Sequence, residues 1–293
     1  MQVRCPAKIN LLLRVLGRRP DEFHALETLM CPVSVHDELT FEPAADGELS
    51  LRIEGADLPA GEDNLVMRAA RLVRQLSGTR RGVKIFLRKH IPVGGGLAGG
   101  SSDAAHTLTA LNEFWQCALT VPQLDAAAAT LGSDVNFFLH RQPALCTGRG
   151  ELVQPVALQA ADGRPLRLGA LLVHPGFGVP TPWAFQTYAA NPAVGEAGRL
   201  TLRQVAADGA VTEFKPRNDL EPAVFGKYLW LAEAKAWLAA QDGVLDSLMS
   251  GSGATVFALT AHREDAEKLA QSAQKYFGPE TWLHPIDLLT APQ

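Results

Sequence analysis

The sequence predicts an α+β protein with two domains, and three observations support this. Short apolar or alternating segments typical of strands are mixed with amphipathic helical segments in the first half. The composition shifts between residues 151 and 182, where a new apolar segment is followed by a Pro/Gly-rich turn. The second half then runs strand, helices, strand, helix. We expect domains at residues 1–160 and 161–293.

Strands are expected where apolar residues alternate or form short buried runs. The segment VKIFLR, for example, places Val83, Ile85 and Leu87 on one face. KINLLLRVL and RLGALLVH are short apolar runs suited to fully buried strands. The expected strands are residues 8–16, 38–42, 49–53, 83–88, 167–174 and 254–259.

Helices are expected where apolar residues recur at helical spacing. In NLVMRAARLVRQL, Asn64 is a plausible N-cap residue, and one stripe contains Leu65, Ala69, Leu72 and Leu76. The expected helices are residues 64–76, 101–115, 121–130, 134–139, 221–240 and 264–277.

Composition and charge exclude several classes of protein. Charged residues make up 20% of the chain, the formal net charge is -4, and Lys and Arg form no block. These features predict no nucleic-acid partner and no membrane partner. The N-terminus lacks a signal-peptide pattern, and the four cysteines lack zinc or redox spacing. We expect a cytoplasmic protein with reduced thiols.

The strongest local signal is a glycine-rich segment between an expected strand and an Ala-rich helix. Glycine lets backbone N–H groups approach a ligand, and a helix N-terminus adds a positive dipole end. The segment therefore predicts an anion site suited to a nucleotide phosphate. Its residues are Pro92, Val93, Gly94, Gly95, Gly96, Leu97, Ala98, Gly99, Gly100, Ser101 and Ser102.

Two other interpretations of this loop compete. Gly94, Gly96 and Gly99 fit the dinucleotide fingerprint G-x-G-x-x-G, but any glycine-dense run produces such a match. That fingerprint belongs in the first βαβ unit, whereas this loop follows several other elements. No Gly-Lys-Ser/Thr sequence of a Walker A motif follows the loop. A plain linker or tight turn is the third interpretation, and the serines that open a helix disfavour it.

Three segments together resemble the GHMP kinases. They are PAKIN at residues 6–10, the glycine-rich loop, and SGSGA at residues 250–254. Longer segments narrow the resemblance to the branch that acts on CDP-methylerythritol. These are PAKINLLLRVLGRRPDEFH, GGGLAGGSSDAA, LGSDVNFF and the Asn-Asp-Leu at residues 218–220. The resemblance extends from about residue 5 to residue 260.

The resemblance implies a fold, a reaction and cofactors. The N-terminal domain would be an α/β domain like domain 2 of ribosomal protein S5, with a left-handed βαβ feature, and the C-terminal domain would be ferredoxin-like. The active site would lie in the cleft between the domains. The reaction would transfer the γ-phosphate of ATP, with Mg²⁺, to the 2-hydroxyl of the methylerythritol unit, in the non-mevalonate route to isoprenoids. A monomer or weak homodimer is expected.

The resemblance also assigns catalytic roles. Lys8 matches the catalytic lysine of the family, although a lone Lys on a strand often only extends to solvent. Asp134 matches the catalytic aspartate, although Asp after Gly is also a common helix N-cap. Phosphoryl transfer depends mainly on positioning and charge stabilisation. A nearby ammonium would keep the aspartate ionised, so that the carboxylate orients the hydroxyl and accepts its proton late.

Binding residues are carried over in the same way. His24 matches the residue that hydrogen-bonds the cytosine, and Phe23 and Phe185 match the aromatic rings around it, although core packing is the simpler interpretation of these three. Asn10 and Thr181 match acceptor contacts, and the loop at residues 251–253 would close the site beneath the phosphates. The ATP contacts are the glycine-rich loop with Asn64 and Lys89, and Ser102 is the candidate for Mg²⁺.

Four positions depart from the family pattern. Phe23 replaces a usual Tyr, and Asn136 replaces a usual Pro. Glu22 and Ala98 replace usual glycines, which puts the local turn and the phosphate loop in question. For Ala98 we expect an ordinary negative φ, at which alanine fits without strain.

Alternative functions are another GHMP kinase with a different small alcohol, a non-catalytic nucleotide-binding relative, and a dinucleotide oxidoreductase. His24 between aromatic residues favours an acceptor that carries a nucleobase. Lys8 and Asp134 together argue against loss of catalysis.

Overall fold

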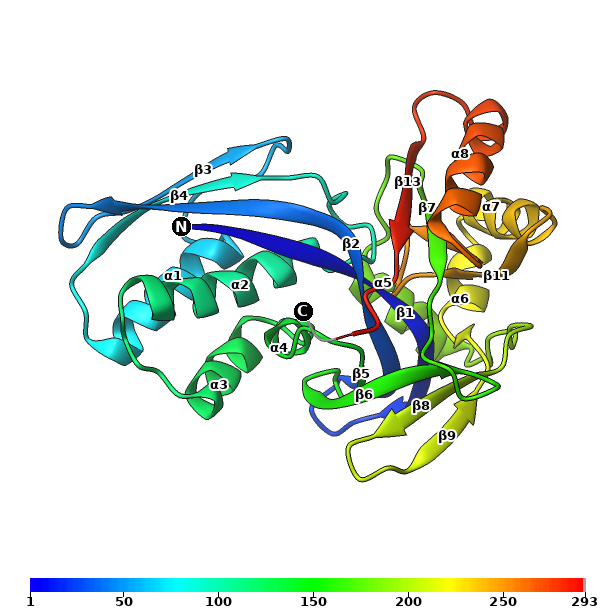
Figure 1. The fold of residues 1–293 in the computed structure, drawn as a ribbon, viewed down its shortest axis with the longest axis horizontal. Helices are drawn as coiled ribbons and strands as arrows, with labels where there is room; N and C mark the ends of the chain where they lie inside the picture. Colours follow the sequence, from blue (N-terminus) through cyan, green and yellow to red (C-terminus); the bar gives the residue numbers. More distant parts are fainter. Residues whose placement is uncertain (292–293) are drawn as a thin grey trace. The chain divides into compact units, whose positions relative to one another are not determined.

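The structure is a computed structural model that describes residues 1–291. Its elements, labelled in Figure 1, are β1 (Gln2–Arg18), β2 (His24–Ala44), β3 (Leu49–Glu54), α1 (Leu65–Ser77), β4 (Gly82–Arg88), α2 (Gly99–Phe114), α3 (Val121–Leu131), α4 (Val135–Leu139), β5 (Ala144–Gly148), β6 (Leu152–Ala160), β7 (Gly169–His174), α5 (Thr181–Ala190), β8 (Leu202–Ala206), β9 (Val211–Phe214), β10 (Arg217–Asn218), α6 (Glu221–Phe225), α7 (Leu229–Ala239), β11 (Val244–Met249), β12 (Val256–Thr260), α8 (Arg263–Phe277) and β13 (Trp282–Asp287).

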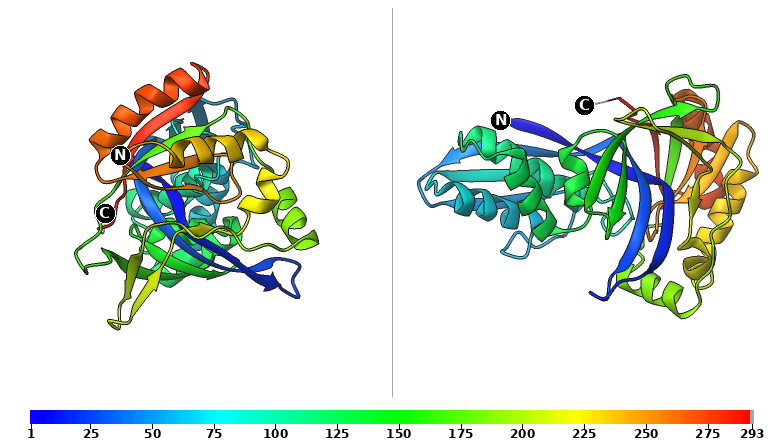
Figure 2. Two further views of the ribbon diagram at one scale, coloured as in Figure 1. Left: turned by 90° about the vertical axis from the view of Figure 1, so that its right-hand side faces the viewer. Right: turned by 90° about the horizontal axis from the view of Figure 1, so that it is seen from below.

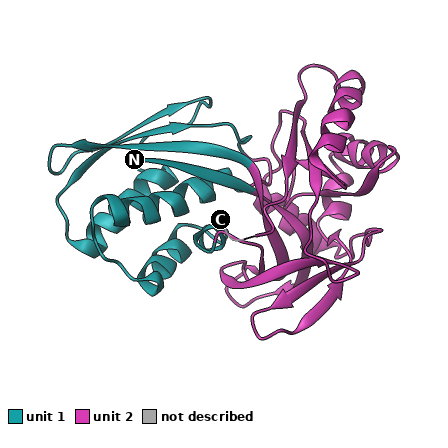
Figure 3. Ribbon diagram, in the orientation of Figure 1, with its two compact units in different colours: residues 1–7, 35–93, 98–140 teal, residues 8–34, 94–97, 141–293 magenta. Residues whose placement is uncertain are grey.

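These elements form two compact units (Figure 3). Unit 1 contains residues 1–7, 35–93 and 98–140, and unit 2 contains residues 8–34, 94–97 and 141–291. Both units are therefore assembled from separate stretches of the chain, and β1 and β2 contribute residues to each. The expected α+β class is confirmed.

Unit 1 is a sheet with helices on one face (Figure 1). β4 pairs antiparallel with the second half of β2 and parallel with β3, so β3, α1 and β4 form a βαβ unit. Helix α2 packs against α1, α3 and α4. The expected face of β4 is confirmed, because Val83, Ile85 and Leu87 are all buried.

Helix α1 begins as predicted but buries a different stripe. The side chain of Asn64 accepts a hydrogen bond from Val66 N, as an N-cap residue does. The expected stripe from Leu65 to Leu76 is wrong at its end, because Leu76 is 45% exposed. The buried residues are Val66, Met67, Ala69, Ala70 and Val73.

Unit 2 contains a four-stranded antiparallel sheet in the order β11-β12-β7-β13. With α5 to α7 between β7 and β11, and α8 between β12 and β13, this is the βαββαβ order of a ferredoxin-like domain. Helices α7 and α8 pack on one face of the sheet (Figure 2). The residues predicted as one helix, 221–240, form α6 and α7, because the chain turns at Gly226 to Tyr228.

The other sheet has nine strands: its main path is β10-β1-β2-β5-β6-β8-β9, and β4 with β3 joins it through β2. β10 pairs parallel with β1 at Leu12 and Leu13, and brings residues 217–218 beside the N-terminal strand. One hydrophobic core joins the elements of unit 2. Its buried residues include Leu13 of β1 and, from the ferredoxin-like sheet, Leu171 and Val256.

Cys5, Cys31 and Cys146 are buried, as expected, and within residues 1–291 the four cysteines form no disulfide. Among residues 1–291, no helix is long and apolar enough to span a bilayer.

Candidate active site

Gly94, Gly95 and Gly96 belong to unit 2, and backbone segments of that unit approach Gly96 closely. A Cβ built on Gly96 would overlap the carbonyl oxygen of Ser250 and lie 3.0 Å from that of Gly253. Gly96 also has a φ of 76°, in the left-handed region. Thr255 N donates to Gly95 O at 3.0 Å, which joins the two loops further. Glycine is therefore required here by protein packing, whatever ligand the loop binds.

Lys8 lies on β1 with its ammonium directed at this loop. Its Nζ donates to Gly96 O at 2.8 Å and to Asn10 Oδ1 at 2.7 Å. Asn10 Nδ2 donates to Thr28 Oγ1, and Thr28 donates to Leu12 O, each at 2.7 Å. Lys8 is 3% exposed, so it is a buried cation and does not extend to solvent. A chain of hydrogen bonds between β1 and β2 thus fixes the two residues matched to catalysis and acceptor binding.

The loop at residues 250–253 is held from two sides. Asn218 Nδ2 donates to Met249 O and to Gly251 O, both at 2.7 Å. Ser250 Oγ donates to Gly96 O at 2.9 Å, and the hydroxyls of Thr181 and Ser252 lie 2.8 Å apart. Thr181, at the start of α5, is therefore brought to the same loop that contacts Gly96.

His24, at the start of β2, stacks on Phe185 of α5 with ring centroids 5.3 Å apart. Burial, together with the charge of Arg18, lowers the pKa of His24 below its usual value, which favours the neutral ring. Phe23 is 51% exposed, and the guanidinium of Arg149 lies 4.9 Å from the centroid of its ring. Phe185 and Phe23 therefore provide aromatic rings next to His24.

The turn before Phe23 persists without the usual glycine. Glu22 adopts a φ of 68°, and its N–H donates to Arg19 O at 3.1 Å. The left-handed geometry that glycine normally supplies is thus adopted by a glutamate, at a cost of about 1 kcal/mol or more.

The expectation for Ala98 is wrong. Ala98 has a φ of 54° and a ψ of 33°, in the left-handed region, at the N-cap position of α2. Its carbonyl accepts from Ser102 N at 3.0 Å and so closes the first turn of the helix. The loop must reverse direction here to enter α2, and the chain keeps this conformation although a Cβ disfavours it.

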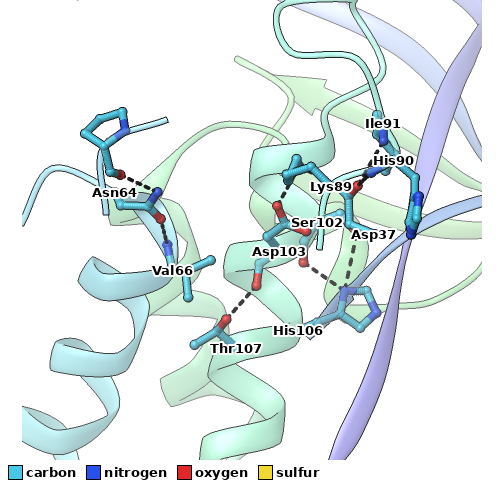
Figure 4. A network of polar contacts seen from close by, with 11 residues as sticks. Asp37, Asn64, Val66, Lys89, His90, Ile91, Ser102, Asp103, His106 and Thr107 are labelled. Carbon is cyan, nitrogen blue, oxygen red and sulfur yellow. Dashed lines mark hydrogen bonds and ion pairs between the residues drawn. The ribbon is translucent and has the colours of Figure 1, made fainter. Parts of the chain in front are cut away.

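Unit 1 contains a buried ion cluster of Asp37, Lys89 and Asp103 (Figure 4). Lys89 donates to Asp37 Oδ2 and, at 2.8 Å, to Asp103 Oδ2. All three side chains are almost completely buried. Asn64, in addition to capping α1, donates to Pro59 O at 2.9 Å. The structure thus shows both Lys89 and Asn64 engaged with protein groups.

The two loop serines differ in exposure. Ser101 is half-buried, whereas Ser102 is fully buried, with its hydroxyl 3.4 Å from Nδ1 of His106. Within residues 1–291 no group of three His, Cys, Asp or Glu residues has the arrangement of a metal site. Mg²⁺ commonly relies on nucleotide phosphates, water and one or two protein groups. Ser102 fits that limited role only if its hydroxyl turns from His106, and Ser101 is the more accessible of the two.

Asp134 is the N-cap residue of α4 by position, although its side chain does not accept a capping hydrogen bond from the first turn of that helix. Two residues later, Asn136 Nδ2 donates to Asp125 O at 2.9 Å. This contact ties α4 to α3.

Several residues of the site were given no role from the sequence, although Asp103 and Asn218 lie in segments quoted for the resemblance. Thr28 and Asn218 hold backbone and side chains near Lys8, and Asp37 and Asp103 bind Lys89. A charged residue inside an apolar segment, as at Asp37 in PVSVHDELTF, was the available signal, because buried charges require partners.

The fold and these residues define a class of protein. The patterns described as GHMP kinases N terminal domain and GHMP kinases C terminal match residues 64–142 and 203–278. A homoserine kinase from Cytophaga hutchinsonii has the same fold, with a TM-score of 0.68 at 18% identity over 100% of this chain and 95% of that one. The chain is thus a kinase of the GHMP class.

Closer relatives narrow the class. The 4-diphosphocytidyl-2-C-methyl-D-erythritol kinase of Methylacidiphilum infernorum is 42% identical, over 97% of this chain and 95% of that one. The kinase of the same name from Pelotomaculum thermopropionicum is 44% identical over 90% of each chain. A solved 4-(cytidine 5'-diphospho)-2C-methyl-D-erythritol kinase has a TM-score of 0.77 at 34% identity, over 98% and 99% of the two chains. The chain belongs to the 4-diphosphocytidyl-2-C-methyl-D-erythritol kinase family.

Proposed function

We propose that this enzyme transfers the γ-phosphate of ATP to the 2-hydroxyl of 4-diphosphocytidyl-2-C-methyl-D-erythritol, in the non-mevalonate route to isopentenyl diphosphate. The similarity to kinases of that name over nearly the whole chain carries the proposal. The four reduced thiols fit a cytoplasmic enzyme. Domains 1–160 and 161–293 remain our proposed division by function.

For ATP, the glycine-rich loop and the N-terminus of α2 form the proposed phosphate site. Ala98 is the N-cap residue of α2 and Gly99 and Gly100 are its first two residues, and the first N–H groups of a helix have no partner inside it. Mg²⁺, when bound with the nucleotide, would neutralise phosphate charge, with the loop serines as protein ligands.

For the acceptor, the proposed contacts are Asn10, Phe23, His24, Thr181 and Phe185. The neutral His24 ring offers both a donor and an acceptor nitrogen to a cytosine edge. Its stacking partner Phe185 and the exposed Phe23 supply flat apolar surface for the base.

In the reaction, Asp134 would orient the acceptor hydroxyl and take its proton as the new P–O bond forms. A carboxylate is a weak base at neutral pH, but phosphoryl transfer depends more on positioning than on base strength. Lys8 would stabilise negative charge on the transferred phosphoryl group, and its bonds to Asn10 and Gly96 O hold the ammonium rigid.

A turnover assay tests the proposal directly. The purified enzyme with ATP and the CDP-linked acceptor should release ADP and give a product with one new phosphomonoester by ³¹P NMR. Free methylerythritol should react far more slowly. Turnover of a different alcohol, with none of the CDP-linked compound, would assign another acceptor.

A further inference from the structure

Asp37 binds the segment that leads into the glycine-rich loop. Its Oδ1 accepts from His90 N at 2.6 Å and from Ile91 N at 2.9 Å, and its Oδ2 accepts from Lys89 Nζ. One fully buried carboxylate of β2 thus holds three consecutive residues at the end of β4.

Lys89 also binds the helix that follows the loop, and so links Asp37 to α2. Its Nζ donates to Asp103 Oδ2 at 2.8 Å, and Asp103 lies in the second turn of α2 (Figure 4). Gly99, the first residue of α2, packs on the same group, since a Cβ there would lie 3.2 Å from Asp37 Oδ2 and 3.0 Å from Ile91 Cγ2. The cluster therefore joins the chain on both sides of residues 92–98.

The cluster combines one ammonium group with two carboxyl groups, so its charges do not balance. Burial raises the pKa of Asp103 to about 7, although Lys89 opposes this and Asp37 adds to it. Burial also disfavours the charge on Lys89, but its two carboxylate partners outweigh that effect and raise its pKa. Among the described side chains, Asp103 Oδ1 has no hydrogen-bond partner. A buried carboxyl group with one unpaired oxygen costs free energy of folding. An apolar residue would fill a purely structural core without that cost.

We infer that Asp37, Lys89 and Asp103 act as positioning residues, a clamp that holds both ends of the phosphate loop in the conformation that accepts ATP. The inference rests on the proposed ATP site and assigns Lys89 a role through the loop in place of direct contact with the nucleotide. The ammonium already faces two carboxylates and is almost fully buried, which favours this role.

Two substitutions at one position test the clamp. Asp103→Ala removes the link to Lys89 and should weaken binding of the non-hydrolysable analogue adenylyl imidodiphosphate roughly tenfold, because small misplacements of a binding loop are costly. The KM for the CDP-linked acceptor should stay within about twofold. Asp103→Asn keeps an oxygen that accepts from Lys89, and should recover most of the lost affinity. Calorimetry on the folded variants gives the dissociation constants.

A matched control separates positioning from stability. Asp246 is also buried and accepts from Ser247 N at 3.0 Å and Leu200 N at 3.3 Å, outside the clamp. Asp246→Ala should lower Tm and leave analogue affinity unchanged. Analogue binding within twofold of wild type in Asp103→Ala, or an equal loss in Asp246→Ala, overturns the inference.

A double substitution separates the clamp from direct contact. Once Asp103→Ala has broken the clamp, adding Lys89→Met should weaken analogue binding little further. A second full loss would show that Lys89 contacts ATP itself and would overturn the inference. Wild-type enzyme that binds the analogue but fails to phosphorylate the CDP-linked acceptor would refute the proposed acceptor and leave the clamp standing. Absence of analogue binding in wild type would refute both.

Discussion

Gly96 and Ser250 are in such close contact that the glycine-rich loop has no room for a side chain at position 96, since a Cβ there would overlap the Ser250 carbonyl oxygen. Packing within unit 2 therefore fixes the shape of residues 94–97.

Gly96→Ala should destabilise the protein and impair catalysis together. The left-handed φ and the overlap should lower the free energy of unfolding by about 2 kcal/mol or more. Urea denaturation and the turnover assay provide the measurements. Gly61→Ala is the control, because nothing lies within 4 Å of a Cβ there. A Gly96→Ala enzyme as stable as the control would refute the packing argument.

Ala98→Gly should stabilise the protein, which is the opposite of what a negative φ would predict. Removing Cβ relieves left-handed strain, and the net gain after the entropy of the unfolded chain should be about 1 kcal/mol. Thermal unfolding measures it. The exposed Ala126 inside α3 is the contrasting control, where Ala→Gly should cost about 1 kcal/mol. Loss of stability at both positions would mean that Ala98 is unstrained.

Asp103→Asn should change how stability depends on pH. With a folded pKa of about 7, Asp103 retains a proton that the unfolded chain releases near pH 4. Its contribution to stability is complete below about pH 4 and is lost as the pH rises through about 7. The asparagine variant, which does not titrate, should gain on wild type across this range. Urea denaturation from pH 5 to pH 8 tests this, and parallel curves would contradict it.

Lys8→Ala and Asp134→Asn should each reduce kcat strongly while ATP binding stays within a few-fold. Both residues are proposed to act at the transferring group, so their loss raises the barrier more than it weakens the ground state. Lys235→Ala is a matched control, because that ammonium pairs with Glu221 outside the proposed site. Near-normal turnover in either purified variant would remove that residue from the mechanism.

His24→Ala should weaken the acceptor and spare ATP. If the neutral ring pairs with cytosine, its loss should cost about 1–3 kcal/mol in acceptor binding. In wild type, acceptor binding should also weaken below the depressed pKa of His24, where the ring becomes charged. Steady-state kinetics for each substrate between pH 5 and pH 8 provide the test. An equal loss for both substrates would indicate a structural histidine.

The sequence allowed prediction of elements with a local signal. Three such predictions are confirmed: Asn64 as the cap of α1, the alternation in β4 and the apolar run of β7. Each depends on residues that are neighbours in the sequence. The 21 residues of β2 were recognised only at 38–42, because its first half lacks alternation and is buried by strands distant in sequence. Strands β5, β6, β8, β9, β10, β11 and β13 were also missed.

Site residues, like the helices and strands, were predictable where the signal is local in the sequence and were missed where it is not. The glycine-rich loop was visible because its composition is unusual, whereas the partners of Lys89 come from positions 37 and 103 and meet only in the folded chain. Ala98 shows the limit of propensity, because a loop held on both sides imposes a backbone conformation that the residue itself disfavours.

The discontinuous make-up of the two units restricts how this gene can change. The chain passes from one unit to the other after residues 7, 34, 93, 97 and 140. A single recombination crossover between homologous genes would therefore combine parts of both units from different parents. Lineages of this enzyme should diverge by substitution and loop insertion, and a hybrid that joins unit 1 of one kinase to unit 2 of another would need several matched junctions.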